Sequence, residues 1–317
     1  MHGNGRGRPR GSSRPSHGGG LLEELRELKR RRQAIILAHN YQPPAIQDLA
    51  DHVGDSLELS LLAARADAEV IVFCGVDFMA EAAALLAPDK LVLLPDLRAR
   101  CSLADMITPE DVRALRAMHP RAAVLSYINS SAAVKAESDA TVTSSNALRV
   151  LEALPNEEVI FVPDGNLGRY LAAHSGRRII TWDGYCRAHH EVRVDDVRTA
   201  RRLHPQAVLM AHPEVRPEVA ARADLVLGTG GMVRAARERA EVEFIVGTEA
   251  GLLHRLTEEN PEKRFYPLSP SLWCQTMKYT TPDRIVACLR ELEPRAQVPP
   301  GVAARARRAV ERMVELT

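Results

Sequence analysis

The chain has 317 residues, of which 45% are hydrophobic and 26% are charged, and its formal net charge is +1. This length exceeds one typical domain of roughly 100–200 residues, and the balanced charge gives no reason to expect a nucleic-acid or membrane partner. The chain contains no run of roughly 20 apolar residues that could span a membrane, and its N-terminus lacks the apolar core of a secretory signal. We therefore expect a cytoplasmic protein whose thiols are kept reduced.

Residues 1–20 form a basic tail rich in Gly, Ser and Pro, with no acidic residue. A segment of this composition cannot bury enough apolar surface to offset the entropy lost on ordering, so we predict that it is disordered. The tail also lacks aromatic residues for base stacking, which disfavours a role in RNA binding.

From residue 34 onward, short apolar segments alternate with helical patterns. The predicted strands are 34–38, 70–74, 91–94, 122–126, 159–162, 178–181, 207–211, 225–227 and 243–246. The predicted helices are 79–86, 110–118, 147–154, 194–203, 232–239 and 251–259. Short buried-type strands separated by helices indicate α/β architecture with parallel sheets.

The chain also resembles itself at a fixed spacing. Residues 118–126 resemble residues 203–211, which lie 85 positions later, and residues 34–38 resemble residues 122–126, which lie 88 positions later. This period is too long for a solenoid motif. It predicts three repeated, small, doubly wound parallel-sheet units around a pseudo-threefold axis. Their expected limits are 21–107, 108–192 and 193–300, with a C-terminal helix at 302–317 as a possible part of the first unit.

The repeat aligns polar residues that follow the predicted strands. It places His39 with Tyr127 and His212, Tyr41 with Asn129 and Glu214, and Ser56 with Ser144 and Thr229. Taken singly, such residues are more often structural hydrogen-bonding groups or helix N-caps. Here the polarity persists while the residue type changes, which favours one asymmetric site built from three units. Open α/β sheets bind their ligands at this carboxyl edge.

Three cysteines occupy equivalent positions in the three units. Cys101, Cys186 and Cys274 each follow the last strand of a unit and are separated by 85 and 88 residues. Three thiolates could hold zinc with one open position, or a [4Fe–4S] cluster with one iron that lacks a protein thiolate; the donor chemistry favours the cluster. Cys74 and Cys288 lie within apolar strand and helix patterns and are expected to be buried core thiols.

Several short motifs resemble the quinolinate synthase family, in order from about residue 21 to about residue 290. They are Ala38–Gln42, Gly54–Ser56, Phe78–Glu81, Tyr127–Ser130, Thr143–Asn146, Pro163–Gly168, Trp182–Cys186, His212–Glu214, Gly247–Glu249, Leu253–Leu256 and Cys274–Lys278. Each motif is weak alone, but their common order makes coincidence negligible.

The resemblance implies a ring-forming step of NAD biosynthesis. The family condenses iminoaspartate, supplied by L-aspartate oxidase, with dihydroxyacetone phosphate, and forms quinolinate with loss of phosphate and two waters. The resemblance also implies that Cys101, Cys186 and Cys274 hold a [4Fe–4S] cluster whose open iron is the Lewis acid.

The resemblance further implies roles for the aligned polar residues. His212 and Glu214 are expected to transfer protons, and the reaction chemistry adds His39 and Tyr41 as candidates. Tyr41, Tyr127 and Asn129 are expected to orient intermediates. The hydroxyls expected to bind the anionic groups of the substrates are those of Ser56, Ser144 and Thr229.

One position departs from the family. Where the family commonly has Gly-Ser-Thr, this chain has Leu227-Gly228-Thr229, so the hydroxyl expected at position 228 is missing. Two other functions remain open at this point. One is an iron–sulfur hydro-lyase acting on a small hydroxy acid, and the other is a cluster-bearing sensor that uses the basic tail.

Overall fold

The computed structural model describes residues 17–316, so most of the predicted disordered tail lies outside the described residues. Within residues 17–316, the strands form three four-stranded sheets with only parallel pairings. The three sheets share one strand order, in which the first strand of each unit lies beside both the second and the third. This arrangement confirms the predicted α/β fold of three repeated units.

Each sheet consists of consecutive strands. The first contains β1 (Ala34–His39), β2 (His52–Gly54), β3 (Val70–Cys74) and β4 (Leu91–Leu93). The second contains β5 (Ala123–Tyr127), β6 (Ala140–Val142), β7 (Glu158–Val162) and β8 (Arg178–Thr181). The third contains β9 (Val208–Ala211), β10 (Leu225–Val226), β11 (Glu243–Gly247) and β12 (Arg264–Pro267). Central strands such as β3 and β5 are buried along their whole length, as expected for strands covered on both faces.

Helices follow the strands at equivalent points. Those after the second strand of each sheet are α3 (Ser56–Arg65), α7 (Ala147–Ala153) and α12 (Thr229–Glu238). Those after the third strand are α4 (Asp77–Leu86), α8 (Gly165–Ser175) and α13 (Leu252–Glu259). The helices α5 (Pro109–Met118) and α10 (Val194–Leu203) precede the second and third sheets. Short helices occupy loops: α2 (Pro44–Gln47), α6 (Ala132–Lys135), α9 (Arg187–His190), α11 (Pro217–Ala220), and the 3₁₀ turns η1 (Ala104–Met106) and η2 (Gln275–Lys278).

The first strand of each unit receives the same acidic side chain at its amino-terminal edge. Asp51 accepts a hydrogen bond from the backbone N–H of Ile36 at 2.7 Å. Asp139 and Asp224 accept equivalent bonds at 2.7 Å from the backbone N–H groups of Val124 and Leu209. These bonds satisfy strand donors that lack a ladder partner.

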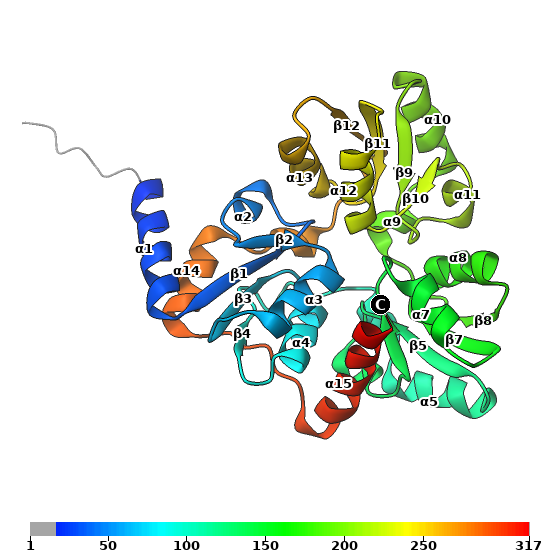
Figure 1. Ribbon diagram of the computed structural model, residues 1–317, viewed down its shortest axis with the longest axis horizontal. Helices are drawn as coiled ribbons and strands as arrows, with labels where there is room; N and C mark the ends of the chain where they lie inside the picture. Colours follow the sequence, from blue (N-terminus) through cyan, green and yellow to red (C-terminus); the bar gives the residue numbers. More distant parts are fainter. Residues whose placement is uncertain (1–16, 317) are drawn as a thin grey trace, which may run out of the picture.

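Helices from both ends of the described chain pack against the first unit (Figure 1). Helix α1 (His17–Arg31) begins within the segment predicted as tail, and it packs against α14 (Pro282–Glu291). Helix α14 also contacts β3, although it follows the third sheet in the chain. The last helix, α15 (Pro300–Glu315), contacts α4 of the first unit as well as α6 and β6 of the second. The exact limits of the three units stay a prediction.

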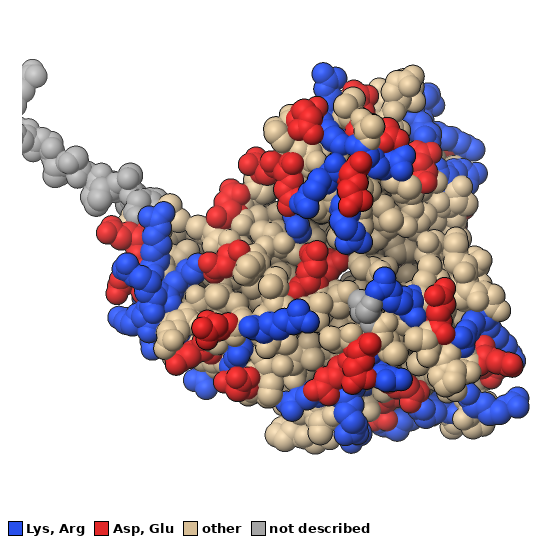
Figure 2. Space-filling view, viewed as in Figure 1, with Lys and Arg blue, Asp and Glu red and all other residues tan. Residues whose placement is uncertain are grey.

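Among residues 17–316, no helix is both long and apolar enough to cross a membrane. On the face shown in Figure 2, Lys and Arg side chains are interspersed with Asp and Glu side chains. Cys74 and Cys288 are buried in the core of the first unit, as the sequence predicted.

Candidate active site

The carboxyl edges of the three sheets meet around a cavity of about 470 Å³. This cavity contains every residue that the sequence singled out for chemistry. Its lining includes His39, Tyr41, Ser56, Cys101, Tyr127, Asn129, Ser144, Cys186, His212, Glu214, Thr229 and Cys274. The predicted repeat therefore brings polar groups from all three units to one place.

Two histidines lie at the carboxyl ends of strands β1 and β9 and make the same local contact in the first and third units. The backbone N–H of Tyr41 donates to His39 Nδ1 at 3.2 Å, and that of Glu214 donates to His212 Nδ1 at 3.3 Å. With Nδ1 accepting, the ring proton of the neutral histidine lies on Nε2. Burial lowers the pKa of each histidine to about 3, and Lys278 contributes further at His39. Both imidazoles are therefore neutral at physiological pH, and His212 Nε2, which lies 3.1 Å from Ser144 Oγ, can donate to that hydroxyl.

The pKa of Glu214 is also lowered, which leaves its carboxyl group charged rather than neutral. Burial would raise its pKa, but the neighbouring His212 and His189, with hydrogen bonds from His189 and Tyr127, outweigh burial and lower the pKa. The amide of Asn129 also donates to Glu214 Oε1 at 3.5 Å. Glu214 is thus an ionised carboxylate, only 3% exposed, that is surrounded by hydrogen-bond donors.

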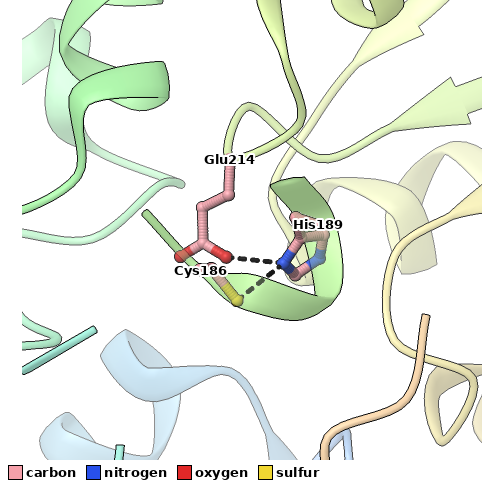
Figure 3. A group of neighbouring side chains, drawn as sticks. All are labelled: Cys186, His189 and Glu214. Atoms are coloured by element: carbon pink, nitrogen blue, oxygen red, sulfur yellow. Dashed lines mark hydrogen bonds and ion pairs between the residues drawn. The ribbon is translucent and has the colours of Figure 1, made fainter. Parts of the chain in front are cut away.

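His189 is a site residue that the sequence reasoning missed (Figure 3). It lies on α9, one turn after Cys186, and its Nδ1 is 2.8 Å from Glu214 Oε2 and 3.2 Å from Cys186 Sγ. Its Nε2 is 2.9 Å from Thr248 Oγ1, which in turn is 2.5 Å from the hydroxyl of Tyr41. A chain of exchangeable protons therefore runs from Tyr41 through Thr248 and His189 to Glu214.

The three aligned cysteines line this cavity as free thiols. Burial raises the pKa of Cys101 and of Cys186, and neighbouring charges, including that of Glu214, raise both further. Three soft sulfur donors in one cavity fit a [4Fe–4S] cluster bound by three protein ligands.

A second donor set overlaps the first. The ligand atoms of Cys186, His189 and Glu214 all lie within 4.8 Å of one another, which is close enough to hold a metal ion. A metal in this part of the protein would therefore contact the same carboxylate that the proton chain reaches.

The predicted anion-binding hydroxyls also meet at the cavity. Ser56 and Thr229 are the first residues of α3 and α12, whose N-termini carry partial positive charge. The Thr229 hydroxyl accepts a hydrogen bond from Asn40 Nδ2 at 3.0 Å.

The structure explains the glycine at position 228. A Cβ atom there would lie 2.7 Å from Ser144 Oγ and 2.9 Å from Ser145 Oγ, so a side chain at this position would displace the two serine hydroxyls of the second unit. Two serine hydroxyls, those of Ser144 and Ser145, therefore lie next to the position where the family has a further hydroxyl.

Known proteins resemble this chain over nearly its whole length. A family model described as quinolinate synthetase A protein matches residues 23–315. The quinolinate synthase of Methanoregula boonei is 51% identical over 296 residues, which cover 93% of this chain and 98% of that protein.

Relatives from other organisms agree. The quinolinate synthase of Dehalococcoides mccartyi is 49% identical over 94% of this chain and 98% of its own length. That of Thermodesulfovibrio yellowstonii is 48% identical over 93% of this chain and 98% of its own length. The chain belongs to the quinolinate synthetase A family of enzymes.

Proposed function

We propose that this enzyme condenses iminoaspartate with dihydroxyacetone phosphate and forms quinolinate, phosphate and two waters. The observation that carries the proposal is the ionised, buried Glu214, which shares one cavity with three cysteine thiols and with hydroxyls from three units. The names of the relatives support the product. The reaction requires no net oxidation, because the atoms of the two substrates balance those of the three products.

Cys101, Cys186 and Cys274 would hold a [4Fe–4S] cluster, since they are the soft donors of the cavity. When bound, the cluster supplies a Lewis acid through the iron that has no protein thiolate. The remaining steps of the proposed reaction use side chains of the protein itself.

Substrate binding depends on anion recognition. Iminoaspartate carries two carboxylates and dihydroxyacetone phosphate carries a phosphate, and these groups suit the hydroxyls of Ser56, Ser144 and Thr229. Tyr127 and Asn129 contact the Glu214 carboxylate and are placed to orient a substrate beside it.

Proton transfer depends on groups with distinct charge states. Glu214 is ionised and can accept a proton from a carbon or nitrogen of the substrate, and His189 is hydrogen-bonded to that carboxylate. His212 and His39 are neutral rings that can donate through Nε2. Tyr41 stands at the far end of the Thr248–His189 chain and can exchange the proton with the cavity.

We also propose which enzyme supplies the imine substrate and in which compartment both enzymes act. Iminoaspartate is short-lived in water because imines hydrolyse, so it must be delivered by an enzyme that oxidises L-aspartate, namely L-aspartate oxidase. We place both activities in the cytoplasm, where thiols remain reduced and available to bind iron.

The direct test is an anaerobic assay of the purified, cluster-loaded enzyme with both substrates. We expect quinolinate, phosphate and water in the proportion given above. An enzyme with an intact cluster that forms no quinolinate, or that instead dehydrates a small hydroxy acid, would refute the proposed reaction.

The cluster ligands are tested by single substitutions. Cys101→Ser, Cys186→Ser and Cys274→Ser should each lose the cluster, as measured by iron and sulfide content and by the electronic spectrum. Cys74→Ser and Cys288→Ala, which alter buried core thiols, should keep it. Retention of a brown chromophore in any of the first three variants would remove that cysteine from the ligand set.

A further inference from the structure

Each unit carries an acidic residue at the start of the helix that follows its third strand. These residues are Asp77 after β3, Asp164 after β7 and Glu249 after β11, and they are separated by 87 and 85 residues. These spacings are close to the 85 and 88 residues that separate the three cysteines, although the self-comparison of the sequence did not single these carboxylates out.

Each carboxylate accepts a hydrogen bond from a backbone N–H at or next to the start of the following helix, although the donor lies one, three or two residues along the chain. Asp77 Oδ1 accepts from the backbone N–H of Phe78 at 2.9 Å, and Asp164 Oδ1 accepts from that of Leu167 at 2.8 Å. Glu249 Oε2 accepts from the backbone N–H of Gly251 at 2.7 Å. One oxygen of each carboxylate therefore accepts from a backbone N–H near a helix start that has no partner within the helix.

Two of the carboxylates also accept a hydrogen bond from a cysteine of their own unit. The backbone N–H of Cys186 donates to Asp164 Oδ2 at 3.2 Å, and that of Cys274 donates to Glu249 Oε1 at 3.1 Å. In the first unit, Asp77 holds the equivalent position, and the nearby backbone N–H of Cys101 helps to lower its pKa against the effect of burial. The bridge from helix start to cysteine backbone thus occurs in the second and third units, and the first unit carries the same kind of residue at the same point.

The surroundings of the three carboxylates differ. Glu249 is buried and pairs with Lys278 Nζ at 2.7 Å. Asp77 is partly exposed and lies 3.7 Å from Arg100 Nε. Asp164 is fully buried, and its contacts are backbone N–H groups. Because the three environments differ, a shared packing requirement does not explain why an acidic residue recurs at this point of each unit, whereas a shared task at the cysteines does.

We propose that Asp77, Asp164 and Glu249 are positioning residues that fix the backbones of the three cysteines so that their sulfurs face one cluster. The inference rests on the proposed cofactor. A cluster requires three sulfurs from three separate units to keep one relative geometry, and a hydrogen bond from a cysteine backbone N–H to a side-chain oxygen restricts the loop that carries that cysteine. Partners of this kind typically change metal affinity by 10–100-fold when they are replaced.

The experiment compares these residues with a matched set in the same protein. Asp77→Asn, Asp164→Asn and Glu249→Gln keep the shape of the side chain but replace one acceptor oxygen with an NH₂ group, so one of the two bonds is lost. The control is Asp139→Asn, which makes the same replacement in an equally repeated carboxylate that accepts from a strand N–H at the opposite edge of the sheet. Asp77→Asn matches this control in exposure, with side chains that are 33% and 44% exposed.

Two measurements are made on each protein. The first is the rate at which a chelator removes iron from the anaerobically loaded protein, together with the electron paramagnetic resonance spectrum of the reduced cluster. The second is amide hydrogen exchange at the cysteine loops of the metal-free protein. We expect the three variants to lose iron about 10–100-fold faster than wild type, to show an altered spectrum, and to exchange the amide protons of the affected loop about tenfold faster. Asp139→Asn should resemble wild type in both.

The outcomes separate two failures. A wild-type protein that takes up no iron would refute the proposed cofactor, and with it the role inferred for these carboxylates. If wild type binds iron and the three variants keep it as well as wild type does, the inference alone fails. It fails also if Asp139→Asn loses iron as fast as they do, because the effect would then reflect general destabilisation.

Discussion

Glu214 and His212 are both almost completely buried in the same cavity, yet both are in the charge state that proton transfer needs. Burial keeps His212 neutral, whereas hydrogen bonds keep Glu214 ionised despite burial. Their residue types and the i, i+2 spacing could be read from the sequence, but their charge states could not, because these depend on partners from other units such as Tyr127 and Ser144.

His189 shows why part of the site was not predicted. The repeat places it in register with Ala104 and Met277, so no polar residue in the other units marks the position. A signal did exist, since His189 follows Cys186 by three residues and a helical turn brings such a pair together.

Replacing Glu214 with Gln should abolish most turnover without loss of the cluster. Gln keeps the shape but cannot accept a proton, so kcat should fall by about 10²-fold or more. Turnover and iron content are measured on the same sample, with the exposed Glu238→Gln on α12 as control. Near-normal turnover in Glu214→Gln would exclude this carboxylate from proton transfer.

The neutral buried histidines predict that the metal-free protein loses stability in acid. His39 has a pKa of about 3 in the folded protein and about 6.5 when unfolded, so below pH 6.5 the unfolded chain binds a proton that the folded protein does not. The contribution of His39 to the free energy of unfolding is complete above pH 6.5 and falls as the pH drops toward 3. At pH 5 it is smaller by about 2 kcal/mol.

Urea unfolding at pH 8 and at pH 5 measures this contribution. The loss of stability between the two pH values should be smaller by about 2 kcal/mol in His39→Gln than in wild type. The exposed His52→Gln should lose as much as wild type. An unchanged pH dependence in His39→Gln would show that this ring is not neutral in the folded protein.

At the scale of elements, the central strands and the edge strands β4, β8 and β10 were predicted closely, whereas the edge strands β2, β6 and β12 were not predicted. The strands β2 and β6 are three residues long, and β12 has exposed ends, so none of them presents an apolar run that distinguishes it from a loop. These strands form by pairing with a neighbour, such as β1 beside β2, which local sequence does not record. Among the helices, α3 was not in the predicted set, and α12 begins at Thr229, three residues before the predicted start at residue 232.

The meeting of α12 with the Ser144–Ser145 segment predicts the effect of a side chain at position 228. Gly228→Ala would force the Ser144 hydroxyl to rotate away from His212 and the Ser145 hydroxyl away from Asp55. Loss of one hydrogen bond, about 1 kcal/mol, should raise the KM for the anionic substrates about fivefold. Steady-state kinetics check this against Gly301→Ala, where the added Cβ meets no atom within 4 Å and KM should not change. An unaltered KM in Gly228→Ala would show that these hydroxyls do not bind substrate.

At the scale of the whole molecule, self-comparison predicted the threefold arrangement but not which sheet α14 covers. An internal repeat reports which segments are equivalent: α14 follows the third sheet as α5 and α10 follow the first and second sheets, whereas α15 has no such counterpart. Their positions depend on buried contacts with the first and second units, including those of Val310 and Met313.

Helix α15 should therefore hold the first two units together. Val310 is fully buried, so Val310→Asp places an unpaired charge between them and should lower the free energy of unfolding by about 3 kcal/mol or more. The cluster should be lost as well, because Cys101 and Cys186 belong to these two units. Thermal unfolding and iron content provide the measurements, and the exposed Arg308→Asp on the same helix should change neither. Full iron content in Val310→Asp would show that the two units stay joined without α15.

The return of α14 and α15 to the first unit also determines when this protein can finish folding during its synthesis. The first sheet leaves the ribosome early, but the helices that cover it are among the last residues to be translated. Until they emerge, apolar surface of that sheet stays exposed to solvent and to chaperones. Cys101 and Cys274 likewise share a cavity only in the completed chain. Iron–sulfur assembly machinery would therefore act on the released polypeptide rather than on the nascent chain.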